Sequence, residues 1–309
     1  MSNALWRGRA LGLAAGLIAC AAIWAAPVAA APVAAAPGRA ECRTAPRKIL
    51  GHPVPYCVIL PADYDSGKAS NYPVLYFLHG LGGNEQMLLN SGGMNMIQDL
   101  RDQKRIGEFL IVAPDGGRSF YINSRDGKVR YEDFFIREFL PYIESHYRVR
   151  TEKKSRGITG VSMGGYGALR FALRYPNLFV AVSAHSAALI DTPPNIKVSS
   201  DQGEAVAAEL GKAFGSQVDV AFWKRESPFT MVRDGPRPAG LQIYSDCGSD
   251  DDFGFNKGNE EFHELLTARG IPHEFHLYPG GHDWQYFAEH LPASFEFQSH
   301  AFGQATPAK

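Results

Sequence analysis

The chain has 309 residues, of which 45% are hydrophobic and 20% are charged. This composition allows a large buried core and excludes an intrinsically disordered chain. Its 31 Lys and Arg residues nearly balance its 32 Asp and Glu residues, so the net charge is −1. Nucleic-acid-binding proteins usually carry a basic excess, and the sequence therefore predicts no nucleic-acid partner.

The first segment differs from the rest of the chain, because no charged residue occurs between Arg9 and Arg39. A short basic start, an apolar run and an Ala- and Pro-rich stretch follow one another, which is the pattern of a secretory signal peptide. We interpret residues 1–36 as an export segment that is removed in the periplasmic or extracellular protein. Two alternatives remain open: an uncleaved membrane anchor, and lipidation of Cys20, whose preceding residues resemble a bacterial lipobox.

Two cysteines flank a predicted hairpin that turns near Gly51 and His52. They are Cys42 and Cys57. An exported protein meets an oxidising compartment, in which disulfides form. Residues that face each other across a hairpin are close enough to interact, so we expect a Cys42–Cys57 disulfide, with two separate thiols as the alternative.

Residues 42–302 are interpreted as one domain in which strands and helices alternate. Short, nearly continuous apolar runs predict strands that are covered on both faces; they are Val54–Leu60, Val74–His79, Phe109–Ala113, Gly157–Val161, Ala181–Ala184, Leu241–Ser245 and His273–Leu277. Helical spacing occurs at Tyr131–Tyr147, Gly165–Arg174 and Glu260–Arg269. The alternation predicts an α/β fold with a mainly parallel central sheet and helices on both faces.

One long stretch, Thr192–Gly235, is polar and interrupted by Pro and Gly. A helical pattern occurs in it only at Glu204–Phe214. We expect this stretch to be a small insertion over the edge of the sheet where ligand sites of α/β folds lie.

A G-x-S-x-G pattern is formed by Gly160, Ser162 and Gly164. It lies between the predicted strand Gly157–Val161 and the helix that starts at Gly165. This context is typical of a sharp turn that presents a serine as a nucleophile, with glycines where side chains would collide. The alternative is an ordinary glycine-rich turn.

The partners of such a serine are sought near the ends of later strands. His282 follows the last strand in a glycine loop, which agrees with the chain order Ser, Asp, His. An aspartate cluster follows the strand before it, and its four members, Asp246, Asp250, Asp251 and Asp252, compete for the acid that orients the histidine. A calcium site is the alternative for this cluster, but its spacing lacks the alternating ligands of an EF-hand.

Other aromatic and histidine side chains are weaker candidates. Trp284 and Tyr121 are predicted to line the substrate pocket, with ordinary core packing as the alternative. His185 is kept as a pocket residue because it follows a strand next to the serine. His79 ends a strand in a glycine-rich turn and is interpreted as structural.

Taken together, four motifs resemble the putative-esterase family of α/β-hydrolases, which includes esterase D, feruloyl and acetylxylan esterases, tributyrin esterases and secreted mycolyltransferases. The motifs are His79–Gly83, Gly160–Gly165, Asp246–Asp251 and Gly280–Trp284. The similarity runs from about Val54 to Phe287. In this family the acid ends a G-x-x-D motif, which implies Asp251, although a shift by one residue to Asp252 stays possible.

The resemblance implies a secreted serine esterase with a Ser162–Asp251–His282 triad, an acyl-enzyme and no metal or cofactor. The implied oxyanion donors are the backbone N–H groups of Leu81 and Met163. An acyltransferase that uses a sugar acceptor is the main alternative. An S-formylglutathione thioesterase is disfavoured because export separates the protein from glutathione, and a non-catalytic binding module is disfavoured by the complete triad. A membrane partner is expected only if Cys20 is lipidated or the leader stays uncleaved, and the sequence predicts no oligomeric state.

Overall fold

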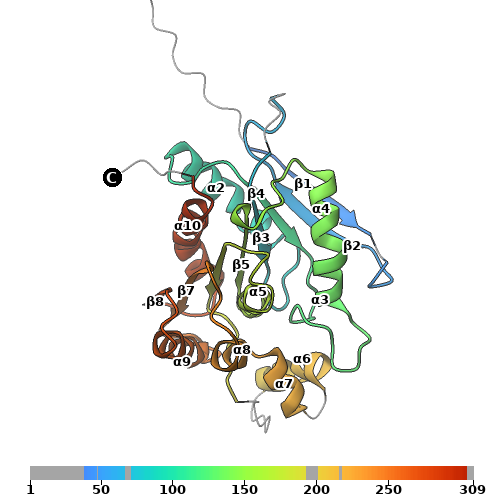
Figure 1. Cartoon of the computed structure of the whole chain (residues 1–309), viewed down its shortest axis with the longest axis vertical. Helices are drawn as coiled ribbons and strands as arrows, with labels where there is room; N and C mark the ends of the chain where they lie inside the picture. The colour runs from blue at the N-terminus through green and yellow to red at the C-terminus, as the bar shows by residue number, and fades with distance from the viewer. Residues whose placement is uncertain (1–37, 47, 67–70, 193–200, 216–217, 305–309) are drawn as a thin grey trace, which may run out of the picture. The chain divides into compact units, whose positions relative to one another are not determined.

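A central eight-stranded sheet organises the protein (Figure 1). The computed structural model describes residues 38–46, 48–66, 71–192, 201–215 and 218–304, so the predicted leader 1–36 and Cys20 lie outside the described ranges. The strand order is β1-β2-β4-β3-β5-β6-β7-β8. The strands are β1 (Ala40–Ala45), β2 (Val54–Ile59), β3 (Val74–Leu78), β4 (Leu110–Pro114), β5 (Arg156–Val161), β6 (Ala181–His185), β7 (Gln242–Gly248) and β8 (Glu274–Tyr278).

The sheet is mainly parallel, as predicted. Only β1 and β2 run antiparallel to their neighbours, and β4, β3, β5, β6, β7 and β8 pair in parallel. Every predicted strand is present, and β1 is the first strand of the predicted hairpin. All residues of β3, β4, β5 and β6 are buried, which explains why β3 and β4 read as unbroken apolar runs. β5 and β6 are buried as well but contain polar residues, among them Arg156 and Ser183. The carboxyl ends of the parallel strands meet at one edge of the sheet.

The hairpin of β1 and β2 carries the predicted disulfide. Cys42 lies opposite Cys57 in the register of the two strands, and their sulfur atoms are bonded. The predicted Cys42–Cys57 disulfide is therefore confirmed.

Helices cover both faces of the sheet, as predicted. Along β3, Val74, Tyr76 and Leu78 belong to one buried cluster, whereas Leu75 and Phe77 belong to the other, because successive side chains of a strand point to opposite faces. The second cluster is completed by α1 (Met87–Asn90), α2 (Gly93–Asp102) and α10 (Trp284–Ala301). The first cluster is completed by α3 (Tyr131–Phe134), η1 (Phe135–Phe139), α4 (Leu140–His146), α5 (Met163–Arg174), α8 (Pro228–Asp234) and α9 (Phe255–Ala268).

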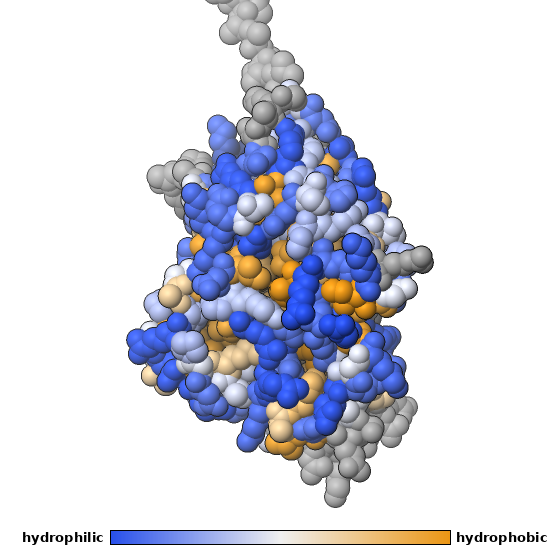
Figure 2. Space-filling view, turned by 45° about the vertical axis from the view of Figure 1, so that its right-hand side comes forward, coloured by the Kyte–Doolittle hydropathy of each residue, from blue (hydrophilic) through white to orange (hydrophobic). Residues whose placement is uncertain are grey.

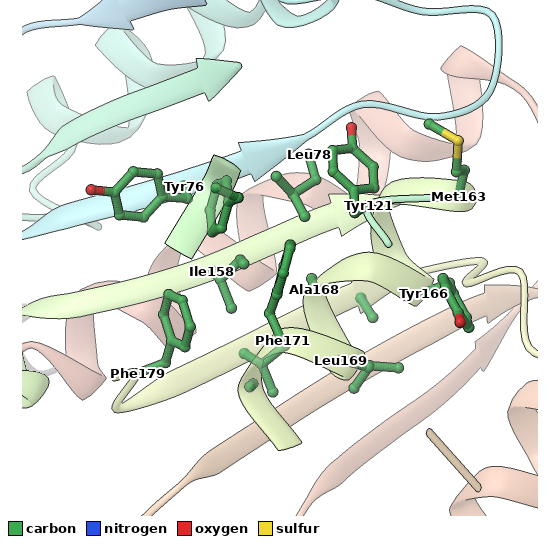
Figure 3. Packing of buried hydrophobic residues seen from close by; sticks show 14 of the residues in the cluster. Tyr76, Leu78, Tyr121, Ile158, Met163, Tyr166, Ala168, Leu169, Phe171 and Phe179 are labelled. Atoms are coloured by element: carbon green, nitrogen blue, oxygen red, sulfur yellow. The ribbon is translucent and has the colours of Figure 1, made fainter. Parts of the chain in front are cut away.

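The first cluster is dense in aromatic side chains. Figure 3 shows Tyr76 and Leu78 of β3, Ile158 of β5, and Phe171 of α5 packed together. The ring of Phe171 stacks on Phe135 with centroids 4.6 Å apart. Burial of each such side chain contributes about 1.5–3 kcal/mol, so α5 is held firmly against the sheet.

The helix boundaries differ from the predictions in ways that have physical reasons. The predicted helix Tyr131–Tyr147 contains one π-helical turn, η1, between α3 and α4, and apolar periodicity does not reveal a single such turn. Helix α9 begins at Phe255, before the predicted start at Glu260. The sequence did not indicate this earlier start, because the first turns of the helix contain weak helix formers. One of them, Gly258, is needed for packing, since a Cβ there would lie 1.9 Å from the carbonyl oxygen of Leu189.

The remaining helices were not predicted. They are α1, α2, α8, α10 and the short helix α7 (Val220–Glu226). Helices α7 and α8 and the predicted helix, observed as α6 (Asp201–Phe214), lie within the predicted insertion Thr192–Gly235. Figure 2 shows a mostly hydrophilic face on which apolar residues gather in a band across the middle. Among the residues described, no helix is long and apolar enough to cross a membrane.

Candidate active site

Ser162 occupies a sharp turn between β5 and α5. Its backbone has φ 55° and ψ −118°, a conformation that non-glycine residues rarely adopt. A Cβ on Gly160 would lie 2.4 Å from the carbonyl carbon of Gly164, and a Cβ on Gly164 would lie 2.0 Å from the carbonyl oxygen of Leu78. Both glycines of the G-x-S-x-G pattern are therefore required for the close packing of this turn.

The Ser162 side chain makes no capping hydrogen bond to α5 and lines a cavity together with His282. The turn itself is held by the neighbouring strand β6, because the Ser162 N–H donates to the carbonyl oxygen of His185, the last residue of that strand, at 2.9 Å. The hydroxyl is thus presented to the cavity by a rigid backbone.

His282 lies in the loop between β8 and α10 and is paired with Asp251. The distance from His282 Nδ1 to Asp251 Oδ2 is 2.6 Å. The other carboxylate oxygen of Asp251 accepts the backbone N–H groups of Phe253 at 3.0 Å and Phe255 at 3.3 Å. The carboxylate is therefore fixed on both sides, and the His282 ring is oriented through Nδ1.

The electrostatics of Asp251 favour its ionised form. Burial by itself would raise the pKa of Asp251, but the hydrogen bond and the charge of His282, together with the two backbone N–H groups, outweigh it and hold the pKa below its usual value. Asp250 and Asp252 are exposed, and Asp250 accepts a hydrogen bond from the Ser249 hydroxyl. Of the aspartates that competed in the sequence, the structure brings Asp251 to His282.

The residues expected to supply the oxyanion donors line the same cavity. Leu81 follows β3, Met163 opens α5, and both line the cavity beside Ser162. As the first residue of a helix, Met163 has an N–H without a partner inside that helix. A Cβ on Gly80 would lie 3.3 Å from the Cβ of Ser162, so the loop that carries Leu81 runs directly against the serine.

The cavity has a volume of about 360 Å³ and is mostly apolar. Several lining residues that sequence reasoning missed are aromatic: Phe214 of α6 and Trp223 of α7 line it, as do Phe253 and Phe255, which follow the aspartate cluster. Phe253 is 50% exposed and lies edge-on to His282, with ring centroids 4.8 Å apart. The predicted insertion thus supplies one wall of the cavity.

A buried ion-pair network attaches the insertion to the serine helix. Arg170 of α5 is fully buried, donates to Glu226 of α7 at 2.9 Å and donates to Glu132 of α3 at 2.6 Å. Burial by itself would lower the pKa of Arg170, but the two carboxylates raise it above its usual value. Removing one partner of such a group would leave a buried charge uncompensated, so the network fixes the aromatic wall relative to Ser162.

Of the two aromatic residues predicted to line the pocket, one lies at the cavity and the other does not. Trp284 lines the cavity and donates from its indole N–H to the carbonyl oxygen of Ser91 at 2.9 Å. The prediction for Tyr121 is wrong: its side chain is fully buried and its hydroxyl donates to the carbonyl oxygen of His79. Its neighbour Phe120 lines the cavity instead, because the chain turns at this point with positive φ at both residues.

The prediction for His185 is also wrong. His185 is fully buried and does not line the cavity. Its Nδ1 lies 2.8 Å from Asp246 Oδ2, and its Nε2 lies 2.8 Å from the hydroxyl of Ser294 in α10. This second Ser-His-Asp arrangement is fully closed to solvent, since all three residues are 0% exposed, and it ties α10 to the ends of β6 and β7.

Replacing Ser294 by Ala is therefore expected to cost stability and to leave activity unchanged. The loss of the bond to His185 costs about 1–3 kcal/mol, because a buried imidazole nitrogen loses its partner. Urea unfolding and ester hydrolysis, measured on the same preparations, would check this. A variant that is stable but inactive would contradict the structural role of Ser294.

Within the described ranges, no three His, Cys, Asp or Glu side chains are grouped so that they could hold a metal ion. The chemical groups at the cavity are a strained serine, an imidazole paired with a carboxylate, and backbone N–H groups. These are the parts required for nucleophilic attack on a carbonyl group.

Comparisons with known proteins find similarity to esterases. Two esterases of Mycobacterium tuberculosis are 34% identical over 242 residues, which cover 73% of this chain and 51% of theirs, so the chain spans about half the length of these relatives. An acetyl esterase of Caldicellulosiruptor saccharolyticus is 29% identical over 268 residues, and the match covers 82% of this chain and 95% of the acetyl esterase. A solved ferulic acid esterase superposes with a TM-score of 0.74 at 28% identity, covering 86% of this chain and 99% of its own.

The family follows from the sequence match and is consistent with the fold. A family model described as putative esterase matches residues 48–297, which include β2 to most of α10 and every residue of the cavity. The predicted α/β-hydrolase fold is confirmed by the parallel sheet and by the solved relatives. The chain belongs to the putative esterase family of α/β-hydrolase enzymes.

Proposed function

We propose that this protein hydrolyses carboxylic esters through an acyl-enzyme on Ser162. The observation that carries the proposal is the pairing of His282 Nδ1 with Asp251 at 2.6 Å, at a cavity that also holds Ser162 in a strained turn. This is the arrangement in which an imidazole is oriented to accept a proton on its other nitrogen.

In the proposed reaction, His282 Nε2 takes the proton of the Ser162 hydroxyl as its oxygen bonds to the ester carbonyl carbon. The N–H groups of Leu81 and Met163 stabilise the tetrahedral oxyanion. When the oxyanion collapses, the carbon–oxygen bond to the alcohol breaks, and the alcohol leaves with the proton from His282. Water then attacks the acyl-enzyme, with His282 again taking a proton, and the carboxylic acid and free Ser162 are released.

Labelling with a fluorophosphonate probe tests the nucleophile. Wild-type protein should gain one covalent adduct on the peptide that contains Ser162, and hydrolysis of p-nitrophenyl butyrate should be lost in proportion to labelling. The buried Ser294 provides an internal control within the same chain. Absence of labelling together with absence of hydrolysis would favour a binding module without catalytic activity.

We propose that the acyl group is apolar and larger than acetyl. The support is the cavity of about 360 Å³, whose insertion wall is formed by Leu210, Phe214 and Trp223 and carries no charged side chain. The names of the relatives include both an acetyl esterase and a ferulic acid esterase, so p-nitrophenyl acetate, p-nitrophenyl octanoate and methyl ferulate form the informative panel. A preference for acetate would contradict the assignment.

Replacing Trp223 by Leu is expected to change selectivity more than overall rate. Lost contact with a bulky acyl group should lower kcat/KM for the octanoate and ferulate esters by about 10-fold or more, while kcat/KM for the acetate changes little. Val220→Ala on the exposed side of the same helix is the matched control, since Val220 is 51% exposed. Equal losses on all esters in Trp223→Leu would indicate a damaged site and no acyl contact.

Export and the fate of the acyl group complete the proposal. Residues 1–36 support secretion by their sequence pattern alone, and mass analysis of the exported protein would distinguish cleavage from lipidation at Cys20.

An acyl-enzyme can also pass its acyl group to a sugar. Product analysis with and without a sugar acceptor distinguishes a hydrolase from an acyltransferase, because only the latter forms a sugar ester.

A further inference from the structure

We propose that His79 is a positioning residue that holds the Gly80–Leu81 peptide so that its N–H points at the oxyanion. The proposal rests on the function proposed above and adds a residue to it. His79 directly follows β3, and its side chain is 1% exposed, so it lies behind the oxyanion loop and not in the cavity.

The hydrogen bonds of His79 determine which ring nitrogen carries the proton. The backbone N–H of Gly116 donates to Nε2 at 2.8 Å. A backbone N–H can only donate, so Nε2 acts as acceptor and the proton of the neutral ring resides on Nδ1. Nδ1 lies 2.8 Å from the carbonyl oxygen of Gly80, and it therefore donates to this oxygen.

One neighbouring carboxylate offers the alternative arrangement. Asp115 Oδ1 lies 3.3 Å from His79 Nε2, which would require the proton on Nε2. A proton on Nε2 would point at the N–H of Gly116. The 2.8 Å hydrogen bond from Gly116 would then be lost, and only the longer contact with Asp115 would remain. Asp115 Oδ1 also accepts the N–H of Gly117 at 2.8 Å, so this oxygen has a partner without the histidine.

The peptide that follows transmits this contact to the cavity. Because a trans peptide is planar, its carbonyl and its N–H point in opposite directions. The Gly80 carbonyl is held by His79 and by the N–H of Gly83 at 3.0 Å, so the N–H of Leu81 is turned the other way. Leu81 lines the cavity, and a Cβ on Gly80 would be 3.3 Å from the Cβ of Ser162.

The preceding peptide is held as well. The buried hydroxyl of Tyr121 donates to the carbonyl oxygen of His79 at 2.9 Å, and its ring lies edge-on to the His79 ring. Two consecutive carbonyl groups of the oxyanion loop are thus fixed by side chains beneath it. A donor bonded to the Gly80 carbonyl also polarises the peptide and strengthens the N–H of Leu81 as a donor.

Two conservative variants separate the nitrogens of His79. In His79→Asn the side-chain amide occupies the place of Nδ1 and can donate to the Gly80 carbonyl. In His79→Gln the amide occupies the place of Nε2 and can accept from Gly116, but no donor reaches Gly80. Each variant loses one buried hydrogen bond, so a purely structural role of His79 predicts similar losses of Tm and of activity in both.

We expect His79→Gln to lower kcat by about 10- to 100-fold with little change in KM, as for a displaced oxyanion donor. His79→Asn should retain most of the wild-type kcat. A trifluoromethyl ketone, which adds to Ser162 and forms an oxyanion, should lose affinity for His79→Gln in the same ratio as kcat/KM. Equal kcat in the two variants, or a change confined to KM or to Tm, would overturn the proposal.

The ¹⁵N shifts of the His79 ring give a second, independent test. A proton on Nδ1 supports the proposal, and a proton on Nε2 overturns it. Failure of the underlying function has a different signature, because wild-type protein would then neither hydrolyse esters nor react with the fluorophosphonate probe.

Discussion

Replacing Ser162 by Ala is expected to lower kcat for ester hydrolysis by about 10⁶-fold, since removal of a catalytic serine abolishes the acyl-enzyme route and leaves only binding and oxyanion stabilisation. The fold should persist, because the Ser162 hydroxyl makes no capping hydrogen bond to α5. Tm should also stay close to that of the wild type, as Ala suffers the same backbone strain at φ 55°. Initial rates with p-nitrophenyl butyrate and a thermal melt measure both quantities.

The control for this variant is Ser294→Ala. Ser294 also contacts a histidine that is paired with an aspartate, so it is matched in chemistry and differs in access. Retention of more than a small fraction of activity in Ser162→Ala, or loss of activity in Ser294→Ala alone, would contradict the assignment of the nucleophile.

Replacing Asp251 by Asn is expected to lower kcat by about 10⁴-fold. The structure explains how. Asp251 Oδ1 accepts two backbone N–H groups, from Phe253 and Phe255, so the oxygen of the new amide must take this side. The NH₂ group then faces His282 Nδ1, which has to act as acceptor. The proton of the neutral ring moves to Nε2, and that nitrogen can no longer accept the proton of Ser162.

The neighbouring aspartates provide matched controls in the same loop. Asp250→Asn and Asp252→Asn remove a charge from exposed positions and should change kcat by no more than about 2-fold. Comparing the three variants at equal ionic strength separates orientation of His282 from a general effect of negative charge. A loss in Asp252→Asn greater than that in Asp251→Asn would move the acid by one residue.

The parts of the fold and site that were predictable depend on neighbours in the sequence. The turn at Ser162 needs Gly160 because the backbone of Gly164, four residues on, approaches the place of its Cβ, and this requirement is written in the local pattern. Gly164 is needed for a contact that is not local, since its Cβ would meet the carbonyl oxygen of Leu78 in β3. The strands were predictable from the local pattern as well. Strands covered on both faces are rich in apolar residues, and β3 and β4 are buried throughout and consist of hydrophobic residues alone. β5 and β6 are also buried throughout and are less regular, since they include Arg156 and Ser183.

Contacts between distant segments were beyond sequence reasoning. Tyr121 was expected in the pocket, yet it supports His79, and the direction of its side chain depends on a turn with positive φ. Helix α7 and its cavity residue Trp223 escaped detection, because this short helix gains its stability from packing and from the ion pair of Glu226 with Arg170, and only weakly from its own sequence.

The choice of acid shows the same division most clearly. Sequence placed a serine, a histidine and several aspartates in the correct order, but Asp246 and Asp251 both end beside a histidine in the fold. Residue type does not separate these two pairs, although their chain order differs, since His185 precedes Asp246 and Asp251 precedes His282. They differ in burial, because His185, Asp246 and Ser294 are closed off beneath α10, whereas His282 and Ser162 line a cavity. Access to solvent arises from the packing of whole helices on the sheet, a property of the assembled structure that no local pattern encodes.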